Sequence, residues 1–360
     1  MIANKAFYRH RVLLAGLCIF FCTIQSCIEP SATSPNKHTN RAFYYWKSEF
    51  LLTPSQTNAL KQADIKKLYV KMFDVDWSEQ YQRAVPVAPV KFTDTPPDFA
   101  NIVPVVYITN KVFVNLPDTL APTLADSICR KVFTLLPDVL CAPVSEIQFD
   151  CDWTATTKNR FFAFLQAAKN LPYMPSVISV TLRLHQLKHQ TQTGIPPANR
   201  AMLMFYNMGN FKDPHTHNSI LDLNTATPYL KYLKNYPLPT DVALPMFSWG
   251  VVFRNGKFTN LINNLTTQQA KINPQILQPI GKNYYKARQT TQLNGSSIGI
   301  NDVVRIEEIT AKQAKQAAQY LQPLLPTPSD TLNIALFHLH PQFFSRFTTT
   351  QIGKIFNALQ

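Results

Sequence analysis

Two pentapeptides in the chain nearly repeat each other, and each carries two carboxylates. FDVDW occupies residues 73–77 and FDCDW occupies residues 149–153. Each follows an apolar run typical of a buried strand, on which residues two apart share one face. Two close carboxylates repel, so one tends to hold a proton, which suits general acid–base chemistry. With a lone glutamate after the first apolar run, the candidate catalytic residues are Glu49, Asp74, Asp76, Asp150 and Asp152.

Structural roles for the same aspartates stay open. Asp150 and Asp152 could cap the helix that follows, or they could pair with Arg183. The first pair could instead lie in a turn that leads into the proline-rich stretch 85–99. The pattern therefore indicates either an active site or two polar strand ends.

Eight apolar runs, mostly separated by helical stretches, are expected to position these residues. The expected strands are 41–50, 66–73, 101–109, 146–150, 176–184, 201–206, 241–249 and 331–340. The expected helices are 53–63, 119–136, 156–171, 226–235, 311–321 and 348–359. This alternation predicts an α/β protein, a closed (β/α)₈ TIM barrel. An open doubly wound sheet is the alternative, but the glycine-rich phosphate motifs GxGxxG and GxxxxGK[ST] do not occur.

The region 251–329 is too long for one βα unit. Its Asn255-Gly256 dipeptide is a strong hairpin signal, and the sequence VVRIEE that follows later is strand-like. We therefore expect an insertion after strand 7, on the loop face of the barrel, or a small subdomain. Glu307 and Glu308 in this segment are expected to be solvated.

Polar or aromatic residues follow nearly every expected strand, where the active site of such a barrel lies. Aromatic faces stack on the C–H surfaces of sugars, carboxylates bind sugar hydroxyls, and a carboxylate pair suits a glycosidic bond. The candidate substrate-binding residues are Trp46, Trp77, Trp153, His185, Tyr206, Asn207, Trp249 and His338. The tryptophans could instead be core residues. We interpret the histidines as hydrogen-bonded barrel residues rather than as metal ligands.

The second pentapeptide also carries a family resemblance. FDCDWT resembles the fourth-strand signature DxxDxDxE of the family 18 glycosidases, the chitinase-like barrels. Asp150 and Asp152 match its second and third aspartates. Ile147 stands at the first aspartate, and Thr154 stands at the glutamate that is the family's general acid.

A second, shorter motif points to the same family. LMFYN, which ends at Tyr206 and Asn207, is similar to the family's sixth-strand M-x-Y-[DN], whose tyrosine helps to bind the substrate N-acetyl group. Trp249 does not align with the family's last-strand tryptophan, and that strand offers His338 and His340 instead. The chain also looks like uncharacterised lipoproteins of Bacteroidetes-type bacteria.

The resemblance implies a glycan ligand but leaves the activity open. Threonine cannot protonate a leaving oxygen, so Thr154 separates two hypotheses. In the first, the barrel hydrolyses a glycan: Asp152 polarises, Asp150 supports it, and Glu49 or an aspartate of the first pentapeptide supplies the acid. In the second, the protein is a non-catalytic glycan-binding or envelope-assembly lipoprotein.

The N-terminal sequence predicts export. Three basic residues precede the apolar stretch 12–24, which is too short for a comfortable membrane span. IQSC then resembles a bacterial lipobox, so we expect a signal peptide at 1–26, lipidation of Cys27, a tether at 27–40 and the barrel at 41–360. An ordinary secretory signal and a short anchor helix are the alternatives. The expected location is the cell envelope, on the periplasmic or outer-membrane face.

Composition limits the expected partners. The net charge is +14, but the basic residues are scattered singly, so we expect a glycan and a membrane anchor rather than nucleic acid. CxxC and HExxH are absent, so we expect neither a metal nor another cofactor. We expect a monomer. A Cys129–Cys141 disulfide is left open, and Cys151 is expected to be buried packing.

Overall fold

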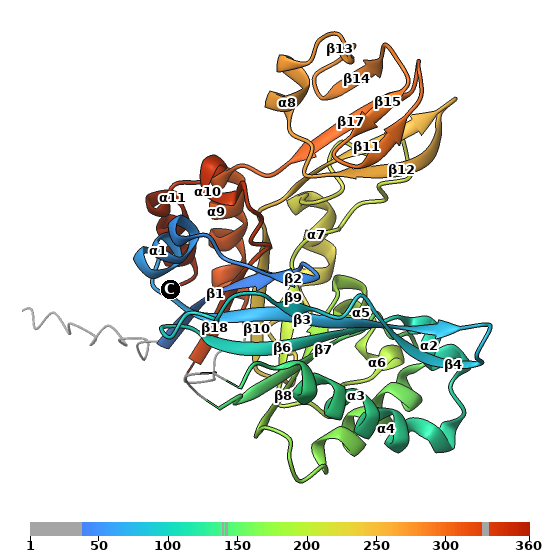
Figure 1. The fold of residues 1–360 in the computed structure, drawn as a ribbon, viewed down its shortest axis with the longest axis vertical. Coiled ribbons are helices and arrows are strands. Elements are labelled where there is room, and N and C mark those ends of the chain that lie inside the picture. The colour runs from blue at the N-terminus through green and yellow to red at the C-terminus, as the bar shows by residue number, and fades with distance from the viewer. Residues whose placement is uncertain (1–37, 139, 141–142, 326–330) are drawn as a thin grey trace, which may run out of the picture. The chain divides into compact units, whose positions relative to one another are not determined.

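The computed structural model describes residues 38–360, except 139, 141–142 and 326–330. Within these residues, eight parallel strands close into a barrel (Figure 1). They are β1 (His38–Tyr45), β3 (Ile65–Ser78), β6 (Asn101–Ile108), β7 (Glu146–Asp150), β8 (Val177–Leu182), β9 (Arg200–Met204), β10 (Thr240–Pro245) and β18 (Thr331–Phe337). Because β1 pairs with both β3 and β18, the sheet has no free edge there. The (β/α)₈ prediction is confirmed.

Helices connect the barrel strands, and two more follow the last strand, β18. They are α1 (Pro54–Gln62), α2 (Asn110–Asn115), α3 (Ala121–Leu135), α4 (Lys158–Lys169), α5 (Leu184–Lys188), α6 (Gln190–Thr193), α7 (Leu223–Leu230), α9 (Ala311–Leu321), α10 (Phe343–Arg346) and α11 (Thr349–Phe356), with 3₁₀ turns at Asp118–Leu120, Gln322–Leu324 and Asn357–Leu359. Thr53 and Gln56 form a capping box at the start of α1, which also has Pro54 in its first turn. In α4 the side chains of Phe161 and Phe164 share the buried face, as their spacing predicts.

The barrel interior is polar. The Tyr44 hydroxyl donates to Gln148 Oε1 (2.6 Å), and Gln148 Nε2 donates to Ser179 Oγ (3.3 Å). Glu146 accepts from Lys67 Nζ (2.8 Å) and from Ser179 Oγ (2.7 Å). Because these buried groups satisfy one another, the strands can place polar side chains below the mouth without leaving them unpaired.

The second barrel strand is longer than expected. β3 has 14 residues, and its last part, Asp74–Ser78, pairs with the antiparallel strand β4 (Arg83–Val87). Nearby, β2 (Glu49–Phe50) pairs with β5 (Lys91–Phe92). The first pentapeptide therefore lies near the end of β3, as predicted, but the strand continues past its expected end at Phe73 into a hairpin.

An antiparallel subdomain lies between β10 and α9 in the chain and is drawn in orange in Figure 1. Its elements are β11 (Ser248–Arg254), β12 (Lys257–Asn263), α8 (Thr267–Ile272), β13 (Leu277–Pro279), β14 (Tyr284–Ala287), β15 (Thr291–Leu293), β16 (Ser296–Ile298) and β17 (Val303–Glu308). The turn between β11 and β12 has positive φ at Asn255 (51°) and Gly256 (73°), as its sequence predicts. Glu307 is 1% exposed, so its predicted solvation was wrong.

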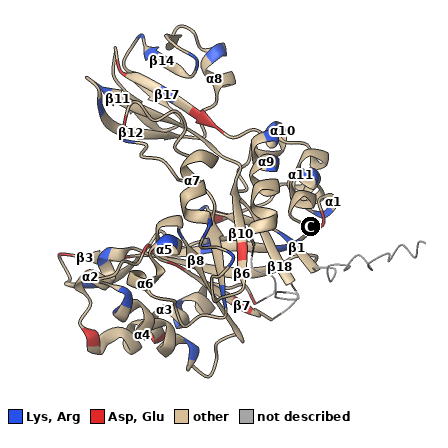
Figure 2. Ribbon diagram, turned by 180° about the vertical axis from the view of Figure 1, so that it is seen from behind, with Lys and Arg blue, Asp and Glu red and all other residues tan. Residues whose placement is uncertain are grey.

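Some expectations fall outside the described residues. These are the signal peptide, the lipidation site Cys27 and the Cys141 end of the expected disulfide. Cys151 is a buried free thiol, as expected. None of the helices in the described part is both long and apolar enough to cross a membrane. Figure 2 shows basic residues scattered over many elements of the ribbon.

Candidate functional site

The aspartates of the second pentapeptide meet an arginine at the end of β8. Arg183 Nε donates to Asp152 Oδ1 (2.5 Å), and its Nη2 donates to Asp150 Oδ1 (3.3 Å). Thr181 Oγ1 also donates to Asp150 Oδ1 (2.6 Å). The Asp150 side chain is 5% exposed and that of Asp152 is 46% exposed. The pair thus has one buried carboxylate and one accessible carboxylate on a shared guanidinium.

The electrostatics of this cluster follow from its burial. Burial raises the pKa of Asp150, although the Arg183 charge and the Thr181 hydrogen bond oppose that rise. Burial alone would lower the pKa of Arg183, but the charges of Asp150 and Asp152 raise it above its ordinary value. The guanidinium is therefore permanently charged, and Asp150 takes up a proton more readily than an exposed aspartate does.

The first pentapeptide contributes one residue to this cluster. Strand register places Asp74 beside Tyr107 and Tyr107 beside Asp150, so the three lie in one row across β3, β6 and β7. Lys71 Nζ pairs with Asp74 Oδ2 (2.9 Å). Burial, with the charges of Asp152 and Asp150, raises the pKa of Tyr107 to about 12. Asp74 therefore lies in the same row as Asp150 with Tyr107 between them; burial is the main cause of the raised pKa of Asp150, and the charge of Asp74 adds to it.

The other two candidate acids have different partners. Asp76 Oδ1 accepts from Thr109 Oγ1 (2.7 Å) and from the Trp77 backbone N–H (2.9 Å). The hydrogen bond from Thr109 is the main cause of its lowered pKa, and Lys111 adds to it. Glu49 is exposed on the short strand β2. Among the interactions of the described residues, neither carboxylate contacts Asp150 or Asp152, so their grouping with the second pair was wrong.

A cavity of about 480 Å³ opens beside the Arg183 cluster. Its lining residues are Asp152, Thr154, Arg183, Leu184, His185, Tyr206, Asn207, Met208 and Tyr229. This volume lies within the range of small-molecule sites. The cavity brings together His185, Tyr206 and Asn207 from the predicted set. His185 lies on α5 rather than at the end of a strand, and Tyr229 on α7 was not predicted.

Thr154 lines the cavity at the position where the family resemblance puts a glutamate. Its Oγ1 lies 2.9 Å from the Thr156 hydroxyl and 3.2 Å from the Thr157 hydroxyl. Its backbone N–H donates to Thr157 Oγ1 (2.9 Å). A threonine hydroxyl does not release a proton near neutral pH, so this position offers no general acid.

Trp153 is a core residue. It is 0% exposed, its ring stacks on Phe161 at 5.3 Å, and its Nε1 donates to the Thr193 carbonyl (3.0 Å). Its assignment as a sugar platform was therefore wrong. Trp46, in contrast, is partly buried beyond the end of β1, with its ring 5.5 Å from Phe337.

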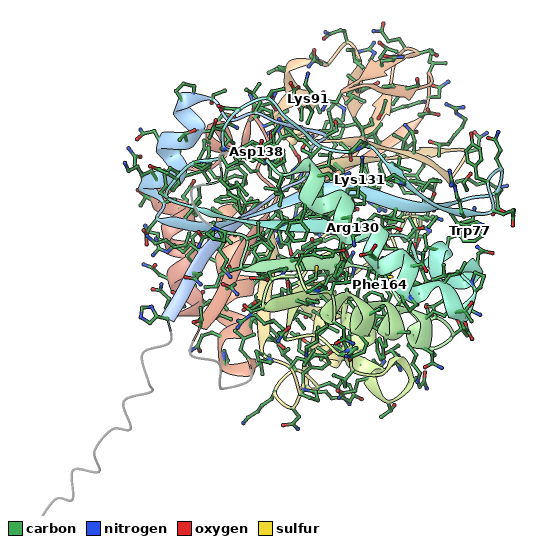
Figure 3. The ribbon with its side chains drawn as sticks, turned by 60° about the horizontal axis from the view of Figure 1, so that its bottom comes forward. Trp77, Lys91, Arg130, Lys131, Asp138 and Phe164 are labelled. Carbon is green, nitrogen blue, oxygen red and sulfur yellow. The ribbon has the colours of Figure 1, made fainter. Side chains whose placement is uncertain are left out.

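The remaining tryptophans lie away from the cavity lining. Trp77 is 8% exposed in the β3–β4 hairpin, near the end of the long strand in Figure 3. Trp249 belongs to β11 rather than to the end of β10, and its Nε1 donates to Glu307 Oε2 (3.0 Å). Both were predicted to bind substrate, and both are buried instead.

The last barrel strand contributes an aromatic residue that was not predicted. The Phe337 ring lies 5.5 Å from Tyr44, 5.0 Å from Tyr206 and 5.8 Å from Phe247. His338 lines a separate small cavity, and burial lowers its pKa to about 4. His338 was predicted because it is a polar residue at a strand end. The side chain that contacts Tyr206 is instead that of the preceding residue, Phe337.

The described residues contain no group of three or more His, Cys, Asp or Glu side chains placed to hold a metal ion. The main cavity presents both polar and aromatic groups to a ligand. Asp152, His185 and Asn207 supply hydrogen-bonding groups there, and Tyr206 and Tyr229 supply aromatic surface.

The chain matches no protein-family model and no curated protein sequence. It is similar in structure to the spore cortex-lytic enzyme SleL of Bacillus megaterium QM B1551 (TM-score 0.52, 15% identity, 90% of this chain and 75% of that one). It is also similar to the C-terminal domain of a putative chitinase from Desulfitobacterium hafniense DCB-2 (TM-score 0.51, 8% identity, 89% and 99%). The Group IV chitinase of Ostrinia furnacalis gives TM-score 0.50, 7% identity, 89% and 99%. The resemblance to family 18 chitinase-like barrels is confirmed for the fold.

Proposed function

We propose that this protein is an exported, lipid-anchored barrel that binds a glycan in the cavity at its mouth. The observation that carries the proposal is the composition of that cavity, where the accessible Asp152 carboxylate faces a volume bordered by Tyr206, Asn207 and Tyr229. Sugars need hydrogen-bond partners for their hydroxyls and flat surfaces for their C–H faces. The chitinases and the spore cortex-lytic enzyme of the same fold support this ligand class.

An N-acetylated glycan is the first ligand to test. Two of the structural neighbours are named as chitinases. Tyr206 and Asn207 lie in the cavity wall and match the motif that, in the resembling family, contributes to N-acetyl binding. Tyr206 is 5% exposed and its ring packs on Phe337. Tyr206 therefore presents a fixed aromatic surface to the cavity.

Binding without cleavage is the form of this function that we propose. The position of the family's acid is occupied by Thr154, and Asp152 is engaged by Arg183. Hydrolysis is the second candidate function. The observation that favours it is the pair itself, in which an accessible carboxylate lies beside a buried carboxylate with a raised pKa.

Titration of the detergent-solubilised full chain with tetra-N-acetylchitotetraose and with cellotetraose tests the proposal. We expect saturable binding of the N-acetylated oligomer, about tenfold weaker binding after Asp152→Asn, and no release of reducing ends. Absence of binding to every glycan in a wider panel would refute the proposal. Reducing ends released by the wild type and lost in Asp152→Asn would establish hydrolysis instead.

The missing acid and the anchor have their own tests. Thr154→Glu places a carboxyl in the cavity wall, whereas Thr156→Glu adds the same charge at an exposed neighbour. Hydrolysis gained only by Thr154→Glu would identify the acid as the missing element. Incorporation of labelled palmitate that is lost in Cys27→Ser would establish lipidation, and retained labelling would contradict it.

A further inference from the structure

The inserted subdomain contains a fully buried ion pair. Arg305 and Glu307 lie on β17, both side chains are 0% exposed, and Arg305 Nε donates to Glu307 Oε1 (2.6 Å). Desolvating two charges is costly, and apolar residues of similar volume often give equal stability. Stability alone therefore does not explain why the pair is buried. The other hydrogen-bond partners of Arg305 and Glu307 indicate another role.

Those partners lie mainly in the loop that follows barrel strand β9. Glu307 Oε2 accepts from the Ser219 N–H (2.8 Å) and from the Ser219 hydroxyl (2.5 Å). Arg305 Nη1 donates to the Asp213 carbonyl (2.7 Å), and Nη2 donates to the Phe211 carbonyl (3.0 Å). The ion pair thus holds three points of one loop by directional, charge-assisted hydrogen bonds.

The same loop forms one wall of the main cavity. The Gly209 N–H donates to the Ser219 carbonyl (3.1 Å), and the Asn207 N–H donates to the Ile220 carbonyl (2.8 Å). Asn207 and Met208 line the cavity. Asn207 also has a positive φ of 54°, a backbone conformation that surrounding contacts must maintain. A continuous path therefore joins Glu307, through Ser219, to the cavity wall.

We propose that Arg305 and Glu307 are positioning residues through which the insertion fixes the β9 wall of the glycan cavity, a role that rests on the function proposed above. Apolar contacts alone would permit this loop to slide on the subdomain, whereas the carboxylate specifies one register for Ser219. Because Glu307 is buried, water does not compete for these hydrogen bonds.

Hydrogen exchange of the full chain, without any glycan, tests the positioning directly. We expect Glu307→Gln to speed exchange about tenfold at the amides of Asn207 and Gly209, read from peptides covering 205–222. Peptides from β7 and β8 should not change. Glu308→Gln is the matched control, because Glu308 is the next residue on β17 and its carboxylate lies 4.0 Å from Arg346. Unchanged loop exchange in a folded Glu307→Gln protein would overturn the proposal.

Two further measurements keep the proposal decidable. If Glu307→Gln does not fold, Ser219→Ala removes only one donor and should speed loop exchange about threefold. Exchange at the wild-type rate in Ser219→Ala would overturn the proposal.

Glycan affinity is the second measurement. For tetra-N-acetylchitotetraose, Glu307→Gln should weaken binding about tenfold, with partial recovery in Glu307→Asp and no change in Glu308→Gln. Faster loop exchange with unchanged affinity would overturn the link to the cavity. If the wild type binds no glycan, the proposed function fails while the exchange result still decides the loop contact.

Discussion

FDVDW and FDCDW differ by one residue in sequence and by much more in structure. In FDVDW, Asp74 pairs with Lys71 of its own strand, and the strand continues into a hairpin. In FDCDW, the strand ends at Asp150, and Arg183, the residue that follows the neighbouring strand β8, contacts both aspartates. The first stretch lies in one strand of an extended β-hairpin. The second stretch lies at the centre of a charged cluster beside the cavity.

The difference shows that the cross-strand partner, rather than the local pattern, sets the chemistry of these carboxylates. The Asp74 side chain is 27% exposed and that of Lys71 is 11% exposed, whereas Asp150 is 5% exposed beneath a guanidinium that both aspartates share. Solvent therefore screens the Asp74 carboxylate more than it screens the buried Asp150 carboxylate.

The largest expected difference comes from removing each cation. Arg183→Met leaves the buried Asp150 without its counter-charge and should lower the free energy of unfolding by about 3 kcal/mol. Lys71→Met affects a partly exposed pair and should lower it by about 1 kcal/mol or less. Urea denaturation of the two variants measures both values. Equal losses would show that the two stretches are energetically equivalent.

The same variants should differ in their pH dependence. The folded-state pKa of Asp150 is already raised, and loss of Arg183 removes the main opposing charge, so the pKa rises further. The protonated form then stabilises the fold at low pH, and that stability is lost as pH rises through the raised pKa. The loss caused by Arg183→Met should therefore be smaller at about pH 4 than at about pH 8.

The two tryptophans provide the second comparison. Trp153→Phe deletes a fully buried hydrogen-bond donor and leaves the Thr193 carbonyl without it, so we expect a loss of about 2 kcal/mol. Trp77→Phe alters a residue at the hairpin, where neighbouring side chains can close the gap, and should cost about 1 kcal/mol. Thermal unfolding of both proteins compares them. A larger loss for Trp77→Phe would reverse the assignment of Trp153 as the core anchor.

Substitutions in the two stretches should also differ in their effect on glycan affinity. Asp152→Asn changes a carboxylate in the cavity lining and should weaken binding of tetra-N-acetylchitotetraose about tenfold, or about 1.4 kcal/mol. Asp76→Asn lies outside that lining and should leave the affinity within about twofold. Titration calorimetry on both proteins measures the ratio. Comparable losses would place the first stretch in the binding site as well.

Strand and turn patterns were sufficient to predict most of the fold. β17 and α9 have the predicted bounds, and the Asn255-Gly256 turn forms as its dipeptide indicates. These elements depend on nearby residues, which a single sequence displays directly. The closed barrel followed from counting strands, because parallel strands alternating with helices leave few arrangements.

The errors concern side chains whose partners lie far away in the chain. Glu307 was expected in solvent, but its partner Ser219 lies 88 residues away. Trp153 was assigned to the mouth because it follows an expected strand, but its Nε1 donates to the Thr193 carbonyl, 40 residues away in the chain. The register that sets Asp74 beside Tyr107 follows an irregularity between Lys71 and Phe73 that no local pattern marks. Such contacts depend on the completed fold.

The smallest expected effect is the pH dependence of the stability change in aspartate-to-asparagine variants. It also gives the clearest contrast, because the sign of this pH dependence differs between the two stretches. Hydrogen bonds and Lys111 lower the pKa of Asp76, so its ionised form stabilises the fold, and this stability is lost as pH falls through the folded pKa. The stability advantage of the wild type over Asp76→Asn should therefore grow by about 1 kcal/mol or less as pH rises to about 5, and it should stay level at higher pH.

Asp150→Asn should show the opposite trend. The raised pKa of Asp150 means that its ionisation disfavours the fold, so the wild type loses stability relative to this variant as pH rises. Urea denaturation of the wild type and both variants between about pH 3 and about pH 8 gives the two differences. Slopes of the same sign would mean that the Arg183 cluster stabilises the ionised form of Asp150 as effectively as Thr109 stabilises that of Asp76.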